Sequence, residues 1–315
     1  MQTSIGVDIG ATNLRVAIGV KDGRILAKLV TKTTHEGDEY ALSRQILEMI
    51  KGLPREYLEN AIEVNIGTTG PLNLKLGYIS PVNLPFKRCY LVEPISKELG
   101  LQVRMFNDCV AAVIGEKFFG QGRNVENLVY VTFGSGIGGG VFVDGRLILG
   151  KDGNAHEVGH FTVDFEGRLV CGCGKRGHWE AYCSGNNIPQ YARYLSSEFN
   201  QEIVRHSVIH DRLNTLTTKE VFDAAKGGDE FALAVVEKVG EINSIGLSDI
   251  VNAYDPELII IGGSVALNNS ELILGPIVGG VKEHAVNKVP DVKLTALGDD
   301  VGLYGTIAAA FYLPY

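Results

Sequence analysis

Apolar and polar positions alternate along the start of the chain in short blocks that predict strands, followed by one block that predicts a helix. Residues 3–10 and 14–20 are apolar runs of strand length, and the Lys-Asp-Gly turn at 21–23 leads into a third run at 24–30. Apolar side chains between 38 and 52 recur at the spacing of one helical face. We therefore expect three strands joined by tight turns, and then a helix.

The first half continues with two more strands and a second helix. Residues 61–67 and 103–108 are strand-like, and the latter run ends on Asn107 and Asp108 before an apolar helical segment at 109–119. An Asn-Asp pair in this place is, taken alone, typical of a helix N-cap.

The second half of the chain repeats the order of the first. Residues 131–149 (VTFGSGIGGGVFVDGRLIL) match residues 7–26 (VDIGATNLRVAIGVKDGRIL) as strand, glycine-bearing turn, strand, Asp-Gly turn and strand. A buried strand at 256–265 ends at a Gly-Gly turn, and a closing helix covers 301–313. We interpret the repetition as an internal duplication. Because no Pro-rich or Ser-rich linker separates the halves, we expect them to share a wide contact with a cleft between them.

The two glycine-bearing turns are the first candidate chemistry. DIGATN (8–13) and GSGIGGG (134–140) each follow one strand and open another, which fits neither the dinucleotide-binding fingerprint nor the P-loop. Main-chain N–H groups in such turns can still bind phosphate, and Asp8 could hold a hydrated Mg²⁺ that bridges phosphates. A tight turn without a ligand is the alternative, but two turns in matching places favour phosphate binding.

Composition and charge narrow the class of protein. The 315 residues are 45% hydrophobic and 21% charged, as expected for a globular protein of one large or two medium domains. A net charge of -8 argues against nucleic acid as the main partner. We see no basic leader and no apolar run long enough for a membrane span. An odd number of cysteines, 5, in so long a chain argues against a disulfide framework and favours the cytoplasm.

Cysteine and histidine gather in one segment. Three of the 5 cysteines and three of the 7 histidines lie between His156 and Cys183, with glycines among them. A Cys-x-Cys pair flanked by glycines is poor core material, so we favour a metal site over packed cysteines.

Taken together, these segments resemble the ROK family, which contains bacterial and archaeal sugar kinases, glucokinases among them, and sugar-responsive repressors. The resemblance runs from Gly6 to about Ala309 and rests on DIGATNLRVAIG, Asn107–Asp108, GSGIGGGVFVDGRL, HEVGH, CGCGKRGHWE and IIIGGSV, in that order. It implies an α/β, duplicated actin-like (ribonuclease-H-like) fold of two lobes, with ATP between the lobes and the sugar deep in the interlobe cleft. We expect residues 1–117 plus 300–315 in one lobe and 118–299 in the other.

The family's metal motif is Gly-His followed by CxCGxxGCxE, with one His and three Cys as zinc ligands. The third Cys of that motif is a histidine here, which leaves the fourth ligand open between His178 and Cys183. Tetrahedral zinc accepts two Cys and two His, and four protein ligands imply a structural role. The resemblance thus gives a structural Zn²⁺ held by His160, Cys171, Cys173 and His178.

The resemblance also assigns the reaction chemistry. Asp108 matches the ROK catalytic aspartate, which would accept the proton of the sugar 6-hydroxyl. The sugar-binding matches are Gly70, Asn83, Asn107, Asp108, Glu157, His160 and Glu180. The matches for ATP and Mg²⁺ are Asp8, Gly10, Thr12, Asn13, Ser135, Gly136, Gly262 and Gly263. Because the turns lack a Walker lysine, main-chain donors and Mg²⁺ would carry most of the phosphate charge.

Two of these positions have a plainer interpretation, and one departs from the family. Asn83 could simply be a turn residue before a loop, and His160 could bind zinc through one ring nitrogen and sugar through the other. His156 stands where relatives often have glycine, and we expect its side chain to point to solvent.

We expect an ATP-dependent hexose kinase that acts on the 6-hydroxyl, with glucose as the first substrate. Kinases of N-acetylmannosamine, N-acetylglucosamine or fructose share the same acidic and histidine residues and remain alternatives. A ROK repressor would need an added N-terminal helix-turn-helix, whereas the first strand begins at residue 3 here. The partners implied are a sugar and ATP, with no nucleic acid or membrane, in a homodimer or homotetramer.

Overall fold

The structure is a computed structural model of the chain that describes residues 1–81 and 84–314. Two compact units can be distinguished. The first contains Met1–Tyr130, Gly140–His156 and Thr295–Tyr315, and the second contains Val131–Gly139 and Glu157–Leu294.

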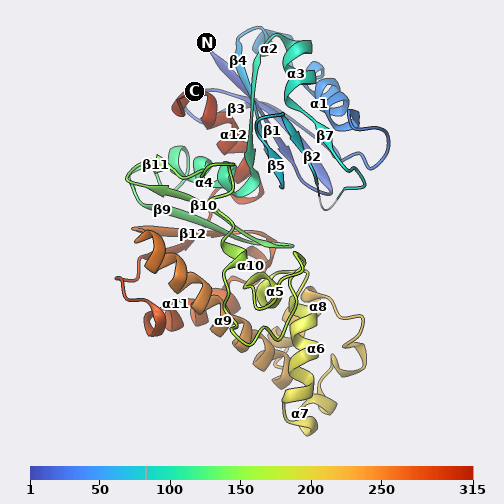
Figure 1. The fold of residues 1–315 in the computed structure, drawn as a ribbon, viewed down its shortest axis with the longest axis vertical. Helices are drawn as coiled ribbons and strands as arrows, with labels where there is room; N and C mark the ends of the chain where they lie inside the picture. The colour runs from blue at the N-terminus through green and yellow to red at the C-terminus, as the bar shows by residue number, and fades with distance from the viewer. Residues whose placement is uncertain (82–83, 315) are drawn as a thin grey trace. The chain divides into compact units, whose positions relative to one another are not determined.

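A five-stranded sheet with the order β3-β2-β1-β4-β8 forms the centre of the first unit (Figure 1). Its strands are β1 (Thr3–Ile9), β2 (Asn13–Gly19), β3 (Ile25–Lys32), β4 (Ala61–Thr68) and β8 (Gln102–Asn107). The pairs β1–β2 and β2–β3 are antiparallel, whereas β1–β4 and β4–β8 are parallel. All five lie where the hydrophobic pattern predicted strands.

Helices cover both faces of this sheet. On one face Ile5 and Val7 belong to a buried cluster that includes Leu42 of α1 (Ala41–Lys51) and Ile95 of α3 (Val92–Leu99). On the other face α12 (Val301–Tyr312) approaches so closely that a methyl group on Gly6 would lie 2.6 Å from Thr306 Oγ1. Such close approach requires glycine at this point of β1.

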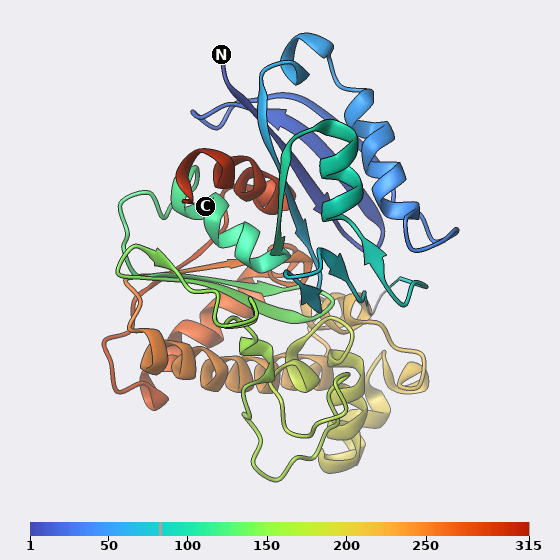
Figure 2. The ribbon, with the colours of Figure 1, turned by 45° about the horizontal axis from the view of Figure 1, so that its top comes forward.

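The helix α4 (Asp108–Phe118) packs against α12, as the turned view shows (Figure 2). The contact is made by small residues: a methyl group on Gly305 would lie 1.6 Å from the carbonyl oxygen of Ala111. The first turn of α4, which begins at Asp108, is therefore held close to the first turn of α12.

The second five-stranded sheet has the order β11-β10-β9-β12-β13. Its strands are β9 (Leu128–Phe133), β10 (Ile137–Val143), β11 (Arg146–Leu147), β12 (Leu258–Gly262) and β13 (Asp291–Leu294). β10 and β11 are antiparallel, and β12 and β13 are parallel. Since this order matches that of the first sheet strand for strand, the predicted duplication is present in the topology.

Several further elements were not predicted from the sequence. A small sheet joins β5 (Leu72–Asn73), β6 (Tyr78–Ile79) and β7 (Cys89–Tyr90), and α2 spans Arg55–Leu58. The second unit adds α5 (Glu180–Cys183), α6 (Ile188–Glu198), α7 (Gln201–His206), α8 (Thr218–Lys226), α9 (Glu230–Tyr254), α10 (Ser264–Asn268) and α11 (Ser270–His284). Short 3₁₀ turns occur at Val158–His160, His210–Arg212 and Gly298–Asp300. None of the helices in the described part of the chain combines the length and apolar character that a membrane crossing requires.

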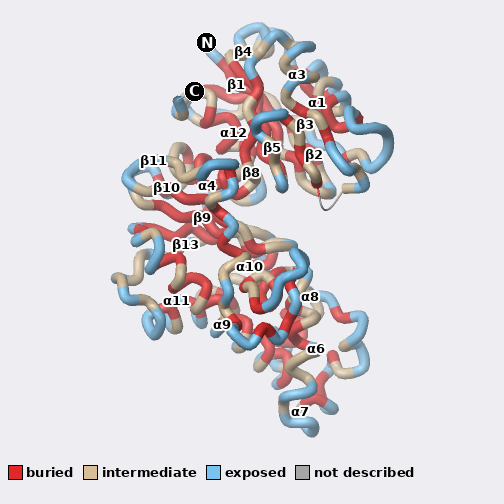
Figure 3. Tube along the Cα trace, viewed as in Figure 1, coloured by how far each residue is buried: buried red, intermediate tan, exposed pale blue. Residues whose placement is uncertain are grey.

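Trp179 is fully buried in the core of the second unit. Buried positions also run along β9, as Figure 3 shows. The Trp179 ring packs edge-on against Phe133 at 5.7 Å, and its Nε1 donates to Asn243 Oδ1 at 2.8 Å. The ring also occupies the place a side chain on Gly246 would need. Trp179 precedes Glu180, so this packing fixes the end of the Cys/His segment.

Candidate active site and metal centre

Asp8, near the end of β1, is the first acidic group of the candidate site. Its cross-strand partner in β2 is Arg15, whose Nη1 donates to Asp8 Oδ2 at 2.9 Å. Arg15 Nε also lies 3.9 Å from Asp300 Oδ1, and Lys28 Nζ lies 2.6 Å from Asp300 Oδ2. Two acidic and two basic side chains thus alternate along one network in the first unit. Sequence analysis assigned no role to Arg15 or Asp300.

The environment of Asp8 disfavours its charged form relative to that of an exposed aspartate. Burial raises the pKa of Asp8 to about 6, the Arg15 guanidinium opposes the shift, and the neighbouring carboxylates of Asp108 and Asp300 add to it. Such a carboxylate gains from a cation beside it, because the cation offsets the cost of burying its charge.

Asp108 is the first residue of α4, directly after β8. The side chain of Asn107 caps the helix by accepting from the Cys109 N–H at 2.8 Å, and Asp108 Oδ1 accepts from the same N–H at 2.8 Å. Burial raises the pKa of Asp108, opposed by the Cys109 hydrogen bond and by His156. A carboxylate with a raised pKa is better suited to accept a proton near neutral pH.

Asp8 and Asp108 approach the same end of α12. A methyl group on Gly302, in the first turn of α12, would lie 3.5 Å from Asp8 Oδ1 and 3.9 Å from the main-chain oxygen of Asp108. The geometry therefore brings together two acidic residues that lie far apart in the sequence.

His156 is buried, contrary to the prediction that it points to solvent. Its side chain is only 2% exposed, and its Nε2 lies 2.8 Å from the carbonyl oxygen of Gly153. Gly153 has a positive φ of 81°, so the chain turns back and directs this carbonyl at the ring. His156, which we expected to face solvent, is thus a buried neighbour of Asp108.

The first glycine turn, residues 10–13, is closed on itself and tied to β3. Gly10 N–H donates to the Asn13 carbonyl at 3.0 Å, and Thr33 Oγ1 donates to the Gly10 carbonyl at 2.7 Å. Thr33 N–H donates to the carbonyl of Thr12 at 3.1 Å. Gly10, Thr12 and Asn13, predicted to bind nucleotide, therefore belong to one braced turn.

A lysine and a histidine also reach this turn, which sequence analysis did not foresee. Lys32 Nζ donates to Asn13 Oδ1 at 3.1 Å, and His35 Nε2 lies 3.0 Å from the carbonyl oxygen of Ala11. The signal that could have found Lys32 is the strand register, in which Lys32 pairs with Asn13.

The second glycine turn, residues 134–137, is also closed on itself, since Gly134 N–H donates to the Gly136 carbonyl at 3.0 Å. The Gly262–Gly263 turn follows β12 and packs against the end of β9. Gly263 has a φ of 87°, and a methyl group there would lie 2.4 Å from the carbonyl oxygen of Phe133. Glycine is required at this position for both reasons. Ser135, Gly136, Gly262 and Gly263 all belong to the second unit.

The residues predicted to bind sugar fall into two groups. Glu157, His160 and Glu180 lie in the second unit, where Glu157 Oε2 is 3.5 Å from His160 Nε2 and Glu180 Oε2 accepts from Ile137 N–H at 2.9 Å. Asn107, Asp108 and Gly70 lie in the first unit. Asn83 lies outside the described residues.

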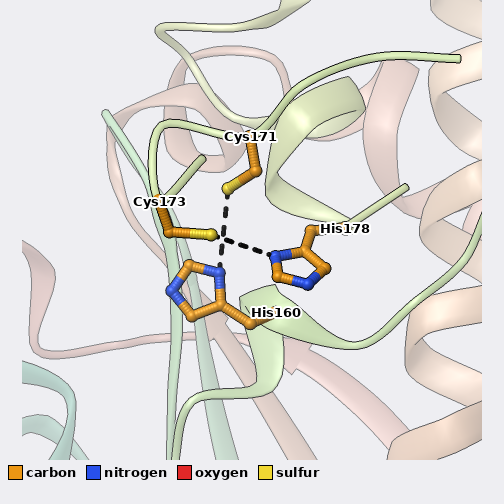
Figure 4. A group of neighbouring side chains, drawn as sticks. All are labelled: His160, Cys171, Cys173 and His178. Atoms are coloured by element: carbon orange, nitrogen blue, oxygen red, sulfur yellow. Dashed lines mark hydrogen bonds between the residues drawn. The ribbon is translucent and has the colours of Figure 1, made fainter. Parts of the chain in front are cut away.

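The four predicted metal ligands form one cluster in the second unit (Figure 4). Their ligand atoms all lie within 4.8 Å of one another. Cys171 Sγ faces His160 Nδ1 at 3.8 Å, and Cys173 Sγ faces His178 Nδ1 at 3.3 Å. This set of two sulfurs and two imidazole nitrogens fits tetrahedral Zn²⁺. Glu157 beside the other nitrogen of His160 is the kind of carboxylate that orients a metal-binding imidazole.

Hydrogen bonds of the backbone shape the cluster. Cys171 N–H donates to the Lys175 carbonyl at 2.8 Å, and Gly174 N–H donates back to the Cys171 carbonyl at 2.8 Å, so the chain reverses tightly around Cys173. Cys183 does not join: it is 1% exposed, and its Sγ faces the carbonyl oxygen of Val239 at 3.5 Å. His178, and not Cys183, lies close to His160, Cys171 and Cys173.

Comparison with known proteins gives the family. The sequence profile of the ROK family matches residues 4–311. This chain belongs to the ROK family. A curated relative, the glucokinase of Aeropyrum pernix, is 36% identical over 329 residues, which cover 100% of this chain and 98% of the relative.

Solved structures of ROK proteins share the fold. The ROK hexokinase from Thermus thermophilus superposes with a TM-score of 0.83 at 29% identity, covering 98% of each chain. The ROK family glucokinase from Streptomyces griseus, solved in complex with glucose and AMPPNP, gives a TM-score of 0.74 at 28% identity, covering 97% of this chain and 98% of that one. The predicted family and the predicted duplicated actin-like fold are both confirmed.

Proposed function

We propose that this ROK protein is an ATP-dependent hexose kinase that phosphorylates the 6-hydroxyl of glucose. The main support for the proposal is that the whole length of the chain matches the glucokinase of Aeropyrum pernix. In addition, Asp108 lies at the start of α4 and has a raised pKa. Phosphoryl transfer asks the protein mainly for positioning and charge stabilisation, and for one base.

Asp108 is the general base in this proposal. Its carboxylate accepts the proton of the sugar 6-hydroxyl as the oxygen attacks the γ-phosphorus, and the proton stays on Asp108 while ADP leaves. Asn107 Oδ1 is used in the helix cap, which leaves its amide N–H groups for a neighbouring sugar hydroxyl. Anchoring the pair at a helix start keeps both side chains in one orientation.

The glycine turns bind the phosphates through their main-chain N–H groups. Asp8 is the carboxylate that would hold a hydrated Mg²⁺, which would offset the charge of the phosphates. Arg15 then balances Asp8 and Asp300, and Lys32 adds a positive charge beside Asn13. Gly262 and Gly263 line the adenosine side.

By their match to the family's motifs, the residues assigned to the sugar hydroxyls are Glu157, His160, Glu180, Gly70 and Asn83. A Zn²⁺ held by His160, Cys171, Cys173 and His178 is structural in this proposal, because four protein ligands leave no open position for a reacting water. It would stabilise the loop that carries the two glutamates.

The setting and assembly follow the family expectation. The described cysteines are all free thiols, the state maintained in the cytoplasm, where we place the protein. We expect a homodimer or homotetramer, to be measured by sedimentation.

A coupled assay of ADP release tests the function with glucose, mannose, fructose, N-acetylglucosamine and N-acetylmannosamine. We expect the highest kcat/KM with glucose and sugar-6-phosphate as the product. A clear preference for an N-acetylated sugar would replace glucose as the proposed substrate. ADP release that does not depend on any sugar would refute the proposed sugar kinase activity.

A further inference from the structure

Glu180 contacts two features of the second unit that are separate in the sequence. Its Oε2 accepts from the main-chain N–H of Ile137, in the second glycine turn, at 2.9 Å. Its Oε1 lies 3.7 Å from Sγ of Cys171, a member of the Cys/His cluster. One carboxylate therefore connects the cluster to the turn.

The glycine at position 136 leaves room for this carboxylate. A methyl group on Gly136 would lie 2.6 Å from Glu180 Oε2, and within 4 Å it would meet no described side chain except that of Glu180. By contrast, a methyl group on Gly134 would lie 3.7 Å from Thr132 Oγ1, which is ordinary van der Waals contact. The two glycines of one turn are thus constrained differently, and Glu180 makes the difference.

The residues that follow Glu180 continue the contact with the turn. Gly185 N–H donates to the Gly134 carbonyl at 2.8 Å, and Asn186 N–H donates to the Ser135 carbonyl at 3.1 Å. At the other end of the segment that carries the Cys/His cluster, a methyl group on Gly159 would lie 2.1 Å from the carbonyl oxygen of Ile137. The turn is therefore enclosed by the two ends of the segment that carries the Cys/His cluster.

We propose that Glu180 is a positioning residue for the second glycine turn, and that the Cys/His cluster fixes the segment that ends at Glu180, since the cluster member His178 lies two residues before it. The carboxylate fixes the direction of the Ile137 N–H and with it the shape in which the turn meets phosphate. Loss of metal from the cluster then loosens the nucleotide side of the site as well as the sugar side. The nucleotide part of this inference rests on the proposed function, whereas the coupling between cluster and turn does not.

Replacement of Glu180 tests the positioning role. In Glu180→Ala the Ile137 N–H loses a charged acceptor, so we expect AMPPNP with Mg²⁺, titrated without sugar, to bind about tenfold more weakly. Hydrogen exchange of the Ile137 amide should accelerate at least as much. In Glu180→Gln the amide oxygen can still accept, so both values should stay within about threefold of the wild type. Unchanged AMPPNP affinity and Ile137 exchange in Glu180→Ala, with only glucose binding lost, would leave Glu180 a sugar ligand alone.

A double-mutant cycle tests the specific contact. Gly136→Ala should displace the carboxylate and weaken AMPPNP binding about as much as Glu180→Ala, whereas the matched control Gly134→Ala should change it less than about twofold. In the double variant the two effects should not multiply, because the clash disappears with the carboxylate. Fully multiplicative effects would overturn the proposal.

Chelation tests the role of the cluster. Removing metal should accelerate exchange at Ile137 in the wild type but add little in Glu180→Ala, while the Ile66 amide in β4 of the first unit serves as the reference. Equal acceleration in both proteins would show that metal acts on the turn without Glu180. If wild-type protein failed to bind AMPPNP at all, the proposed function would fail, and the exchange measurements would still decide the coupling.

Discussion

The two glycine turns have the same place in the two sheets but differ in what surrounds them. The first turn, residues 10–13, has Asp8 before it, Arg15 after it and Lys32 against it. In the matching sequence of the second turn, Thr132 stands in the place of Asp8 and Gly139 in the place of Arg15. The second turn is instead held by Glu180 and the segment that follows it.

This difference shows how the two copies of a duplicated fold can carry different functional features. Both copies keep the strand-turn-strand backbone, which supplies main-chain N–H groups in each turn. The first copy adds the acidic and basic side chains that the proposed chemistry needs, and the second adds a bracing loop with the Cys/His cluster. The comparison can be tested by removing the special features of each side in turn.

The largest effect is expected from Asp108, the proposed base in the first unit. Asp108→Asn cannot accept the hydroxyl proton, so kcat should fall about 10²- to 10⁴-fold while calorimetry still detects glucose binding. Asp22→Asn, in an exposed hairpin turn, is the matched control and should retain normal turnover. Normal turnover in Asp108→Asn would remove the chemical distinction between the two units.

The next largest effect is expected from the Cys/His cluster of the second unit. We expect about one zinc per chain in the wild type. Cys171→Ser and His178→Ala should each lose this metal, and the melting temperature should fall by about 5 °C or more. Cys183→Ser should keep its metal, because Cys183 faces Val239 rather than the cluster. Elemental analysis and thermal unfolding give both values. Metal retained in His178→Ala but lost in Cys183→Ser would reverse the choice of fourth ligand.

A smaller effect concerns pH and the buried charge of Asp8. Burial raises the pKa of Asp8 to about 6, so between about pH 4 and pH 6 the folded chain binds more protons than the unfolded chain. Without Mg²⁺, the free energy of unfolding should therefore decrease as pH rises through this window, by up to about 3 kcal/mol from Asp8. Urea unfolding across that range should show a flatter pH dependence in Asp8→Asn than in the wild type. An unchanged slope would mean that Asp8 titrates normally.

The smallest effect is expected at Lys32. Lys32→Ala removes an exposed positive charge beside the first turn, so KM for ATP should rise about fivefold with KM for glucose unchanged. Lys51→Ala, which breaks an exposed ion pair with Glu98, is the control for loss of a surface lysine. Steady-state kinetics at low and high salt measure both. Equal KM values for ATP in the two variants would assign the phosphate charge to other groups.

Much of the framework could be predicted from local patterns. The strands β1 to β4 and β8 to β10, the helix α4 and the closing helix follow from apolar runs and turns that lie within short stretches of sequence. The helices between residues 184 and 284 were not predicted. The cluster of His160, Cys171, Cys173 and His178 was predicted because its members lie close in sequence and match a known motif.

His156 shows where local reasoning fails. Its sequence neighbours, Ala155 and Glu157, do not reveal whether the side chain faces solvent, and the prediction that it does was wrong. The turn at Gly153 and the packing of the first unit decide its burial. Arg15 and Lys32 were missed for a related reason, since their importance comes from partners across a strand pair or at a turn.

The sequence by itself determined the order of elements, the duplication, the family and the candidate functional side chains, because periodicity, turn residues and motifs are local properties of the chain. Only the tertiary structure decided which groups meet. It paired Asp8 with Arg15 and placed Asp108 at the same helix end, excluded Cys183 from the cluster, and turned the Glu180 carboxylate toward the Ile137 N–H. These contacts join residues distant in sequence, and only the packing of strands against helices brings them within hydrogen-bonding reach.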